Sequence, residues 1–178
     1  MATPSLWLNS AASGARGRAP RSPGPGAWLL GLWLVLAALA CALPAHAETP
    51  LPAAHDLRAS AAKAAGRGQP LVLMFSLPGC TYCEQLRHST YGWMVRDGVD
   101  VEQVEMLASY HLVGFDGRPT DGQALAAQYR VGLAPTVLFL GPGGRELGER
   151  LVGAGEPDFY QAYVDRSMAQ ARAHLRGG

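Results

Sequence analysis

The chain has 178 residues, with fifteen basic and fourteen acidic side chains. This length suits one domain with some chain to spare. Three of the basic residues lie within the first 47 positions and all of the acidic ones lie after them, so the remaining chain carries a formal net charge of about −2. That balance gives no basic face for nucleic acid, and nucleic-acid binding is excluded from the expected functions.

The first 47 residues have the three-part pattern of a secretory signal peptide. Arginines stand within residues 16–21, an apolar run follows over residues 27–42, and small residues stand at the cleavage positions 45–47. We therefore expect residues 1–47 to be a cleaved signal peptide and the protein to be periplasmic.

Two other fates of this leader stay open. The apolar run has 16 residues, fewer than the roughly 20 that span a bilayer, but an uncleaved anchor facing the periplasm is an alternative. In a lipoprotein, Cys41 would become the lipidated first residue, although Ala38 stands where a leucine is usual. The long charged region also leaves open a start codon further along the chain.

Helices and strands are predicted in alternation after the leader. The proline-bearing residues 48–54 are expected to be a flexible linker, and the alanine-rich residues 55–65 a helix. The unbroken apolar run Leu71–Ser76 predicts a strand buried on both faces. A helix from about 80 to 95 and an alternating strand over 99–107 are expected next.

The second half of the chain completes this pattern. Residues 108–119 are expected to be irregular, and a capping box with Thr120 as N-cap opens a helix that ends near Tyr129. A glycine-rich turn joins two predicted antiparallel strands over 135–140 and 145–152. The last helix starts at Glu156-Pro157 and carries one apolar stripe, formed by Tyr160, Val164, Met168, Ala171 and Leu175.

Two cysteines remain after the leader, Cys80 and Cys83, and they stand where the buried strand gives way to a helix. Unpaired N–H groups and the dipole at a helix N-terminus stabilise a thiolate, so the pKa of Cys80 is expected below the usual value of about 8.5. Residues three apart lie on one helical face, so the two sulfurs can form a disulfide. The pattern predicts that Cys80 attacks a substrate disulfide and that Cys83 resolves the mixed disulfide.

Three other uses of the cysteine pair stay open from the residues alone. A zinc site needs two more ligands. A structural disulfide is a second alternative, although it would constrain little chain. Paired thiolates also bind Cu(I), although no methionine- or histidine-rich segment flanks them. We expect no metal and no cofactor, because the histidines after the leader have no ligand-like spacing: His55, His88, His111 and His174.

The chain resembles the thioredoxin-like superfamily in two segments. Leu71–Cys83 is similar to its active-site strand and helix, and residues 129–136 are similar to the segment that leads to its cis-proline. Gly153 falls where thioredoxins carry a glycine. The insert around Phe115 resembles the periplasmic thioredoxin-related proteins, including the SoxW type.

This resemblance implies an α/β thioredoxin-like fold over residues 55–178, with three α/β/α layers and a central mixed sheet. It implies a thiol:disulfide oxidoreductase, monomeric, whose partners are protein thiols and disulfides and a membrane-linked electron donor. Pro135 would be cis and, with Ala134 and Tyr82, would shape the site at which a substrate segment pairs in an extended conformation.

Departures from the family pattern bear on the direction of electron flow. Met74 stands where thioredoxins carry a buried aspartate, which removes the acid/base group for the second cysteine. Glu84 and Glu105 are the candidate substitutes, although each is more typical of a solvated carboxylate. The intervening Thr81-Tyr82 is neither the pair of thioredoxin nor that of strong oxidants. The prediction is a reductase or isomerase rather than a strong oxidant, and the alternative is a Cu(I) chaperone or a catalytically idle binding module.

Overall fold

The structure is a computed structural model that describes residues 51–177. The predicted signal peptide, with its apolar run, lies outside the described residues. Within them, no helix has the length and apolar character needed to cross a membrane. The helices are α2 (Leu57–Gly66), α3 (Thr81–Leu86), α4 (Gly92–Arg96), α5 (Gly122–Tyr129) and α6 (Pro157–Gly177). The strands are β1 (Leu71–Ser76), β2 (Val101–Glu105), β3 (Leu112–Val113), β4 (Pro119–Thr120), β5 (Thr136–Leu140) and β6 (Leu151–Val152).

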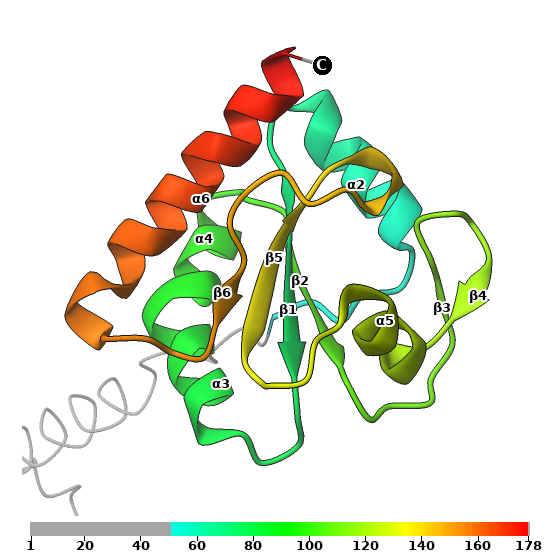
Figure 1. Cartoon of the computed structure of the whole chain (residues 1–178), viewed down its shortest axis with the longest axis horizontal. Helices are drawn as coiled ribbons and strands as arrows, with labels where there is room; N and C mark the ends of the chain where they lie inside the picture. Colours follow the sequence, from blue (N-terminus) through cyan, green and yellow to red (C-terminus); the bar gives the residue numbers. More distant parts are fainter. Residues whose placement is uncertain (1–50, 178) are drawn as a thin grey trace, which may run out of the picture. The chain divides into compact units, whose positions relative to one another are not determined.

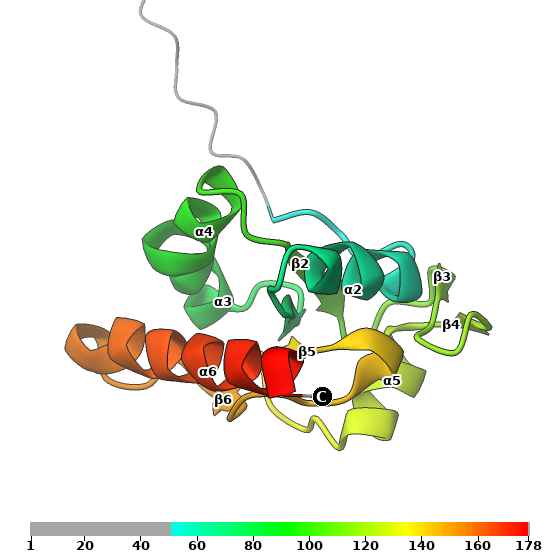
Figure 2. The same ribbon diagram turned by 90° about the horizontal axis from the view of Figure 1, so that it is seen from above.

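These elements form three layers, as expected from the sequence (Figures 1 and 2). The central four-stranded sheet has the order β2-β1-β5-β6. Strand β1 is parallel to β2 and antiparallel to β5, and β5 is antiparallel to β6, so the sheet is mixed. Helices α2 and α5 pack on one face, and α3, α4 and α6 pack on the other.

The central position of β1 in the sheet explains why its sequence is almost wholly apolar. All six of its residues are buried, because both of its edges are paired and both of its faces are covered. Leu73 and Phe75 belong to the core beneath α2 and α5, whereas Val72 and Met74 belong to the core beneath α3, α4 and α6. The stripe of α6 joins the second core, with four members buried and Leu175 packed against them.

Residues 51–54 differ from the flexible linker predicted over 48–54. The Gln103 N–H donates to the Pro52 carbonyl, and the Ala54 N–H donates to the Gln103 carbonyl, both at 2.8 Å. Leu51 is only 3% exposed. Strand β2 is at the edge of the sheet, so its outward-facing backbone N–H and C=O groups are free to form hydrogen bonds with residues 52–54.

The single helix predicted over 80–95 is instead interrupted. A π-helical turn, Arg87–Tyr91, separates α3 from α4. A Cβ on Gly92 would lie 2.6 Å from the Arg87 carbonyl oxygen, so only glycine permits this close approach. Gly92 is therefore needed where the π-helical turn meets α4.

Three smaller predictions are also wrong. Thr120 pairs with Leu112 in a short β3–β4 hairpin, so residues 108–119 are not wholly irregular. The N-cap of α5 is Asp121, whose carboxylate accepts from the Ala124 N–H at 2.8 Å. The predicted strand over 145–152 is interrupted: Glu146 makes an isolated bridge with Leu140, and β6 begins only at Leu151. Between them the chain packs closely along α6, where a Cβ on Gly148 would meet the Ser167 carbonyl oxygen at 2.4 Å.

Candidate active site

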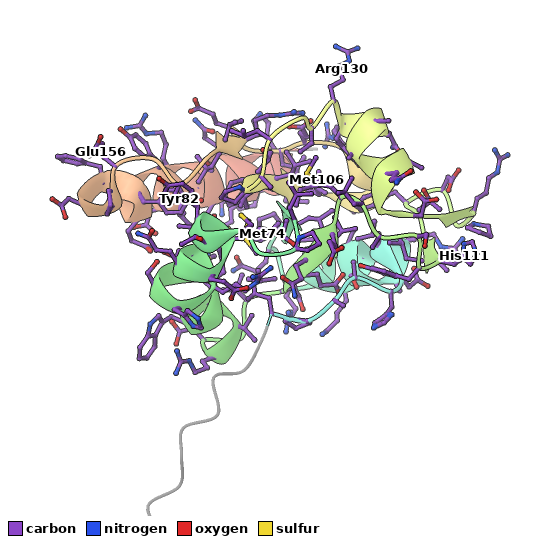
Figure 3. The ribbon with its side chains drawn as sticks, turned by 90° about the horizontal axis from the view of Figure 1, so that it is seen from below. Met74, Tyr82, Met106, His111, Arg130 and Glu156 are labelled. Atoms are coloured by element: carbon purple, nitrogen blue, oxygen red, sulfur yellow. A yellow bond between two sulfur atoms is a disulfide. The ribbon has the colours of Figure 1, made fainter. Side chains whose placement is uncertain are left out.

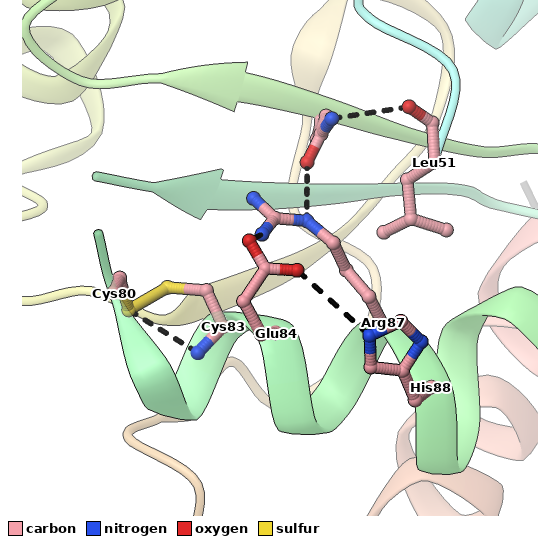
Figure 4. Close-up of polar contacts among 7 residues, drawn as sticks. Leu51, Cys80, Cys83, Glu84, Arg87 and His88 are labelled. Atoms are coloured by element: carbon pink, nitrogen blue, oxygen red, sulfur yellow. Dashed lines mark hydrogen bonds and ion pairs between the residues drawn. A yellow bond between two sulfur atoms is a disulfide. The ribbon is translucent and has the colours of Figure 1, made fainter. Parts of the chain in front are cut away.

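Cys80 and Cys83 lie at the junction of β1 and α3, where they form a disulfide with Cα atoms 5.2 Å apart (Figure 4). Gly79 makes the turn out of the strand with a φ of 67°, a left-handed conformation that favours glycine. Cys80 is the N-cap of α3, and its sulfur accepts a hydrogen bond from the Cys83 N–H at 3.2 Å. An N–H donor and the positive end of a helix at this position both favour a thiolate.

The two cysteines differ in their access to solvent. Cys83 is fully buried, whereas Cys80 is half-buried. Tyr82, between them, is 62% exposed and labelled in Figure 3. Cys80 is therefore the more accessible of the two cysteines to a protein partner.

The segment before β5 lies at the same edge of the sheet as the turn to Cys80. Thr136 is in register with Phe75 on the antiparallel neighbour, so the residues that precede β5 lie beside those that follow β1. The Ala134–Pro135 peptide bond is cis. Pro135 is buried and its carbonyl accepts from the Gly153 N–H at 2.8 Å, whereas neither backbone polar group of Ala134 has a hydrogen-bond partner among residues 51–177.

The sheet face beneath α3 lacks a carboxyl group at its centre. Met74 is fully buried there, in the same core cluster as Leu86 of α3. The carboxylate of Glu84 is instead on the outer side, 57% exposed, where it pairs with Arg87 and lies 4.0 Å from the His88 Nε2 (Figure 4). Glu105 is half-buried at the end of β2.

A polar pocket of about 360 Å³ adjoins the turn that leads to Cys80. Its lining includes residues 76–79 together with Glu84, Arg87 and Glu105. Burial raises the pKa of the Tyr110 hydroxyl in the same pocket, so this group stays protonated at neutral pH. The pocket brings both candidate carboxylates to the edge of the cysteine turn.

Two polar residues of this site were not identified from the sequence. Arg87 donates from Nε to the Gln103 side-chain oxygen at 2.8 Å, and both residues line the pocket. The three-residue spacing from Glu84 to Arg87 is a signal for their ion pair. Gln103 had no such signal, because its partners are distant in sequence.

The histidines that follow the leader do not gather with the cysteines. Within residues 51–177, no group of three or more histidine, cysteine, aspartate or glutamate side chains is placed to hold a metal ion.

Several solved structures are similar to this chain. The periplasmic thioredoxin SoxS from Paracoccus pantotrophus is 24% identical, with a TM-score of 0.41 over 57% of this chain and 97% of that one. A thioredoxin from Thermus thermophilus is 23% identical, with a TM-score of 0.44 over 64% and 85%. The DsbH oxidoreductase is 19% identical, with a TM-score of 0.46 over 71% and 90%.

A search of curated proteins finds no match to this sequence. A protein family described as a thioredoxin-like domain matches residues 57–167, which is more than half of the chain. The match includes the active-site strand, the cysteine pair and the segment before β5. The chain therefore belongs to the family of thioredoxin-like domains.

Proposed function

We propose that this protein is an exported thiol–disulfide oxidoreductase that exchanges disulfides with protein thiols through Cys80 and Cys83. One observation carries the proposal: a half-buried cysteine caps α3 and bonds to a fully buried cysteine one turn further along the helix. Export rests on the leader pattern over residues 1–47, and the proposed location is the periplasm.

The exchange proceeds in two steps. In the reduced protein, the Cys80 thiolate attacks one sulfur of a substrate disulfide, and the other substrate sulfur leaves as a thiolate that takes up a proton. Cys83 then loses its proton and attacks the Cys80 sulfur, which releases the second substrate thiol. The substrate gains two electrons and two protons, and the protein ends with the Cys80–Cys83 disulfide seen in the structure.

The backbone of Ala134 is a candidate binding site for a substrate segment. Its unpaired N–H and C=O groups can bond to an extended peptide, as in strand addition. Leu133 is 53% exposed and Tyr82 62% exposed, so apolar side chains are available near both parts of the site. We propose that Ala134, Pro135 and Tyr82 form the docking surface for a protein segment.

The proposed direction is reduction or isomerisation rather than strong oxidation. A strong oxidant needs a strongly stabilised thiolate in its reduced form. In the pocket beside the cysteine turn, Arg87 is paired with Glu84, which weakens but does not cancel the effect of its positive charge on a thiolate. A reductase in the periplasm also needs electrons from across the membrane, so we propose a membrane-linked electron donor. We also propose that the protein is monomeric.

Substitution of each cysteine tests the two-step exchange. Cys83→Ser is expected to accumulate mixed disulfides with protein partners, visible on a non-reducing gel, because the first attack proceeds and the second cannot. Cys80→Ser is the matched control and is expected to trap nothing. Equal trapping by both variants, or by neither, would contradict the assigned roles.

The equilibrium with glutathione then tests the direction. A potential near that of thioredoxin, about −270 mV, supports a reductase, whereas a value near about −120 mV would make the protein a disulfide donor and overturn that part of the proposal. The mass of the protein recovered from the periplasmic fraction shows whether the leader has been removed.

A further inference from the structure

The side chain of Gln103 connects the N-terminal segment to the segment that follows the cysteine pair, through the labelled residues Leu51 and Arg87 of Figure 4. Its Nε2 donates to the Leu51 carbonyl at 3.1 Å, and its Oε1 accepts from the Arg87 Nε at 2.8 Å. Its backbone is also paired with the segment 52–54. Both ends of the amide are therefore occupied, and the oxygen is fixed toward Arg87.

Arg87 is held from two directions as a result. Its Nε binds Gln103, and its Nη1 forms an ion pair with the Glu84 carboxylate. Only 15% of its side chain is exposed, whereas the Glu84 side chain is 57% exposed. The Arg87 backbone N–H also donates to the Cys83 carbonyl, so the backbone of Arg87 lies one helical turn after Cys83. Water screens the anion of this ion pair more than the cation.

Few other charges face this turn. Glu105 and Tyr110 line the same pocket, and His88 lies near Glu84 on the outer side. Among the described residues that line the pocket, Arg87 is the only cation. The sheet beneath α3 contributes the uncharged Met74. The positive charge in the pocket beside α3 therefore depends on where the Arg87 guanidinium is held.

We propose that Gln103 is a positioning residue for the redox pair: it fixes Arg87 beneath α3 and thereby stabilises the thiolate of the reduced protein. The inference rests on the proposed function, because it concerns the same cysteine pair. The N-terminal segment takes part through the Leu51 carbonyl, so residues that look like a linker belong to the active-site scaffold.

The expected effect is modest and has a definite sign. A unit charge about two helical turns away, partly screened by water, changes a pKa by about half a unit. Gln103→Leu releases the Arg87 Nε and lets the guanidinium move toward solvent, so the pKa of Cys80 should rise by up to that amount. The equilibrium with glutathione should shift by up to about threefold toward the protein disulfide, because the thiolate form is less stabilised.

Two further variants of the full-length protein separate electrostatics from a general loss of structure. Glu84→Gln removes the anion and leaves Arg87 in place, so it should lower the pKa of Cys80, opposite to Gln103→Leu. Gln69→Leu is the matched control: the Arg172 Nε donates to the Gln69 oxygen at 2.7 Å, a bond of the same kind just before the start of β1, at its far end from the cysteines. This control should lose similar stability and leave the pKa of Cys80 unchanged.

The measurements are the pH dependence of thiolate absorbance in the reduced proteins and their equilibrium with glutathione. A shift in Gln103→Leu no larger than in Gln69→Leu overturns the proposal, and so do shifts of the same sign in Gln103→Leu and Glu84→Gln. If Gln103→Leu does not fold, Arg87→Met removes the cation directly and must raise the pKa of Cys80. None of these measurements needs a protein substrate, so a failure of Cys83→Ser to trap partners would remove the proposed function separately.

Discussion

Tyr91 and Tyr160 form a buried hydroxyl pair that joins the π-helical turn after α3 to α6. Their oxygens are 2.9 Å apart and their rings meet edge to face, with centroids separated by 6.3 Å. The two residues are 0% and 4% exposed. Within residues 51–177, neither hydroxyl has another hydrogen-bond partner, so a single Tyr→Phe change leaves the remaining hydroxyl buried and unpaired.

The double-mutant cycle follows from this arrangement. Each single change should lower the free energy of unfolding by about 2 kcal/mol, because a lost partner leaves an unsatisfied polar group. Tyr91→Phe with Tyr160→Phe removes both groups and should lower it by about 2 to 3 kcal/mol in total rather than about 4. The coupling free energy is therefore expected at about 1 to 2 kcal/mol.

Urea unfolding of the oxidised protein measures this cycle, with an unchanged m-value as the check for two-state behaviour. Tyr163→Phe is the control, because this side chain is on the same helix but 41% exposed; it should change stability by less than about 0.5 kcal/mol. Single changes that add to the double within about 0.5 kcal/mol would refute the reasoning, since independent hydroxyls cannot be each other's partner.

Three further predictions concern stability. Burial raises the pKa of the Tyr160 hydroxyl to about 12 from its ordinary 10.0; the unfolded chain loses this proton first, so the melting temperature should fall as pH rises from about 10 to about 12, and less so in Tyr160→Phe. Gly122→Ala would place a Cβ 2.0 Å from the Glu105 carbonyl oxygen, so urea unfolding should show a loss of about 3 kcal/mol or more, and a wild-type midpoint would contradict the close approach. Leu51→Ala should lose about 2 to 4 kcal/mol in the same assay, and a loss below about 0.5 kcal/mol would show that residues 51–54 are a free linker after all.

The parts of the fold that were predictable depend on local patterns. The run Leu71–Ser76 is apolar without interruption, which indicates a strand covered on both faces, and β1 has these bounds. The stripe of the last helix repeats every three or four residues, and four of its five members are buried in α6, with Leu175 packed against them. The position of Cys80 at a strand-to-helix junction follows from the same local signals, and the structure makes it the N-cap of α3.

The missed features depend on contacts between distant residues. Gln103 binds a carbonyl 52 positions away, and a glutamine in an edge strand otherwise indicates a solvated side chain. Thr120 and Asp121 are both good N-cap residues. Thr120 belongs to β4 and pairs with Leu112 of β3, so Asp121 is the residue that caps the helix. Periodicity alone carries no information on such pairings.

Met74 stands where the resemblance to thioredoxins places a buried aspartate, and Met74→Asp tests what that departure does. The side chain is fully buried, so a carboxyl there should have its pKa raised by about 3 units. The unfolded chain ionises near pH 3.9, so the free energy of unfolding should fall, relative to wild type, by about 4 kcal/mol between pH about 4 and about 7. Lost packing adds about 2 kcal/mol at every pH.

Urea unfolding at pH 5 and pH 8 measures this difference. An equal loss at both pH values would mean that the new carboxyl is solvated or paired, for example with Arg87, and that the face beneath α3 is not the dry surface described above. The same variant shows whether the missing acid matters for catalysis. If proton transfer from Cys83 limits the second attack, mixed disulfides with a model substrate should resolve faster in Met74→Asp than in wild type despite its lower stability. Unchanged resolution would mean that a carboxylate already present, Glu84 or Glu105, or water in the pocket accepts this proton in the natural sequence.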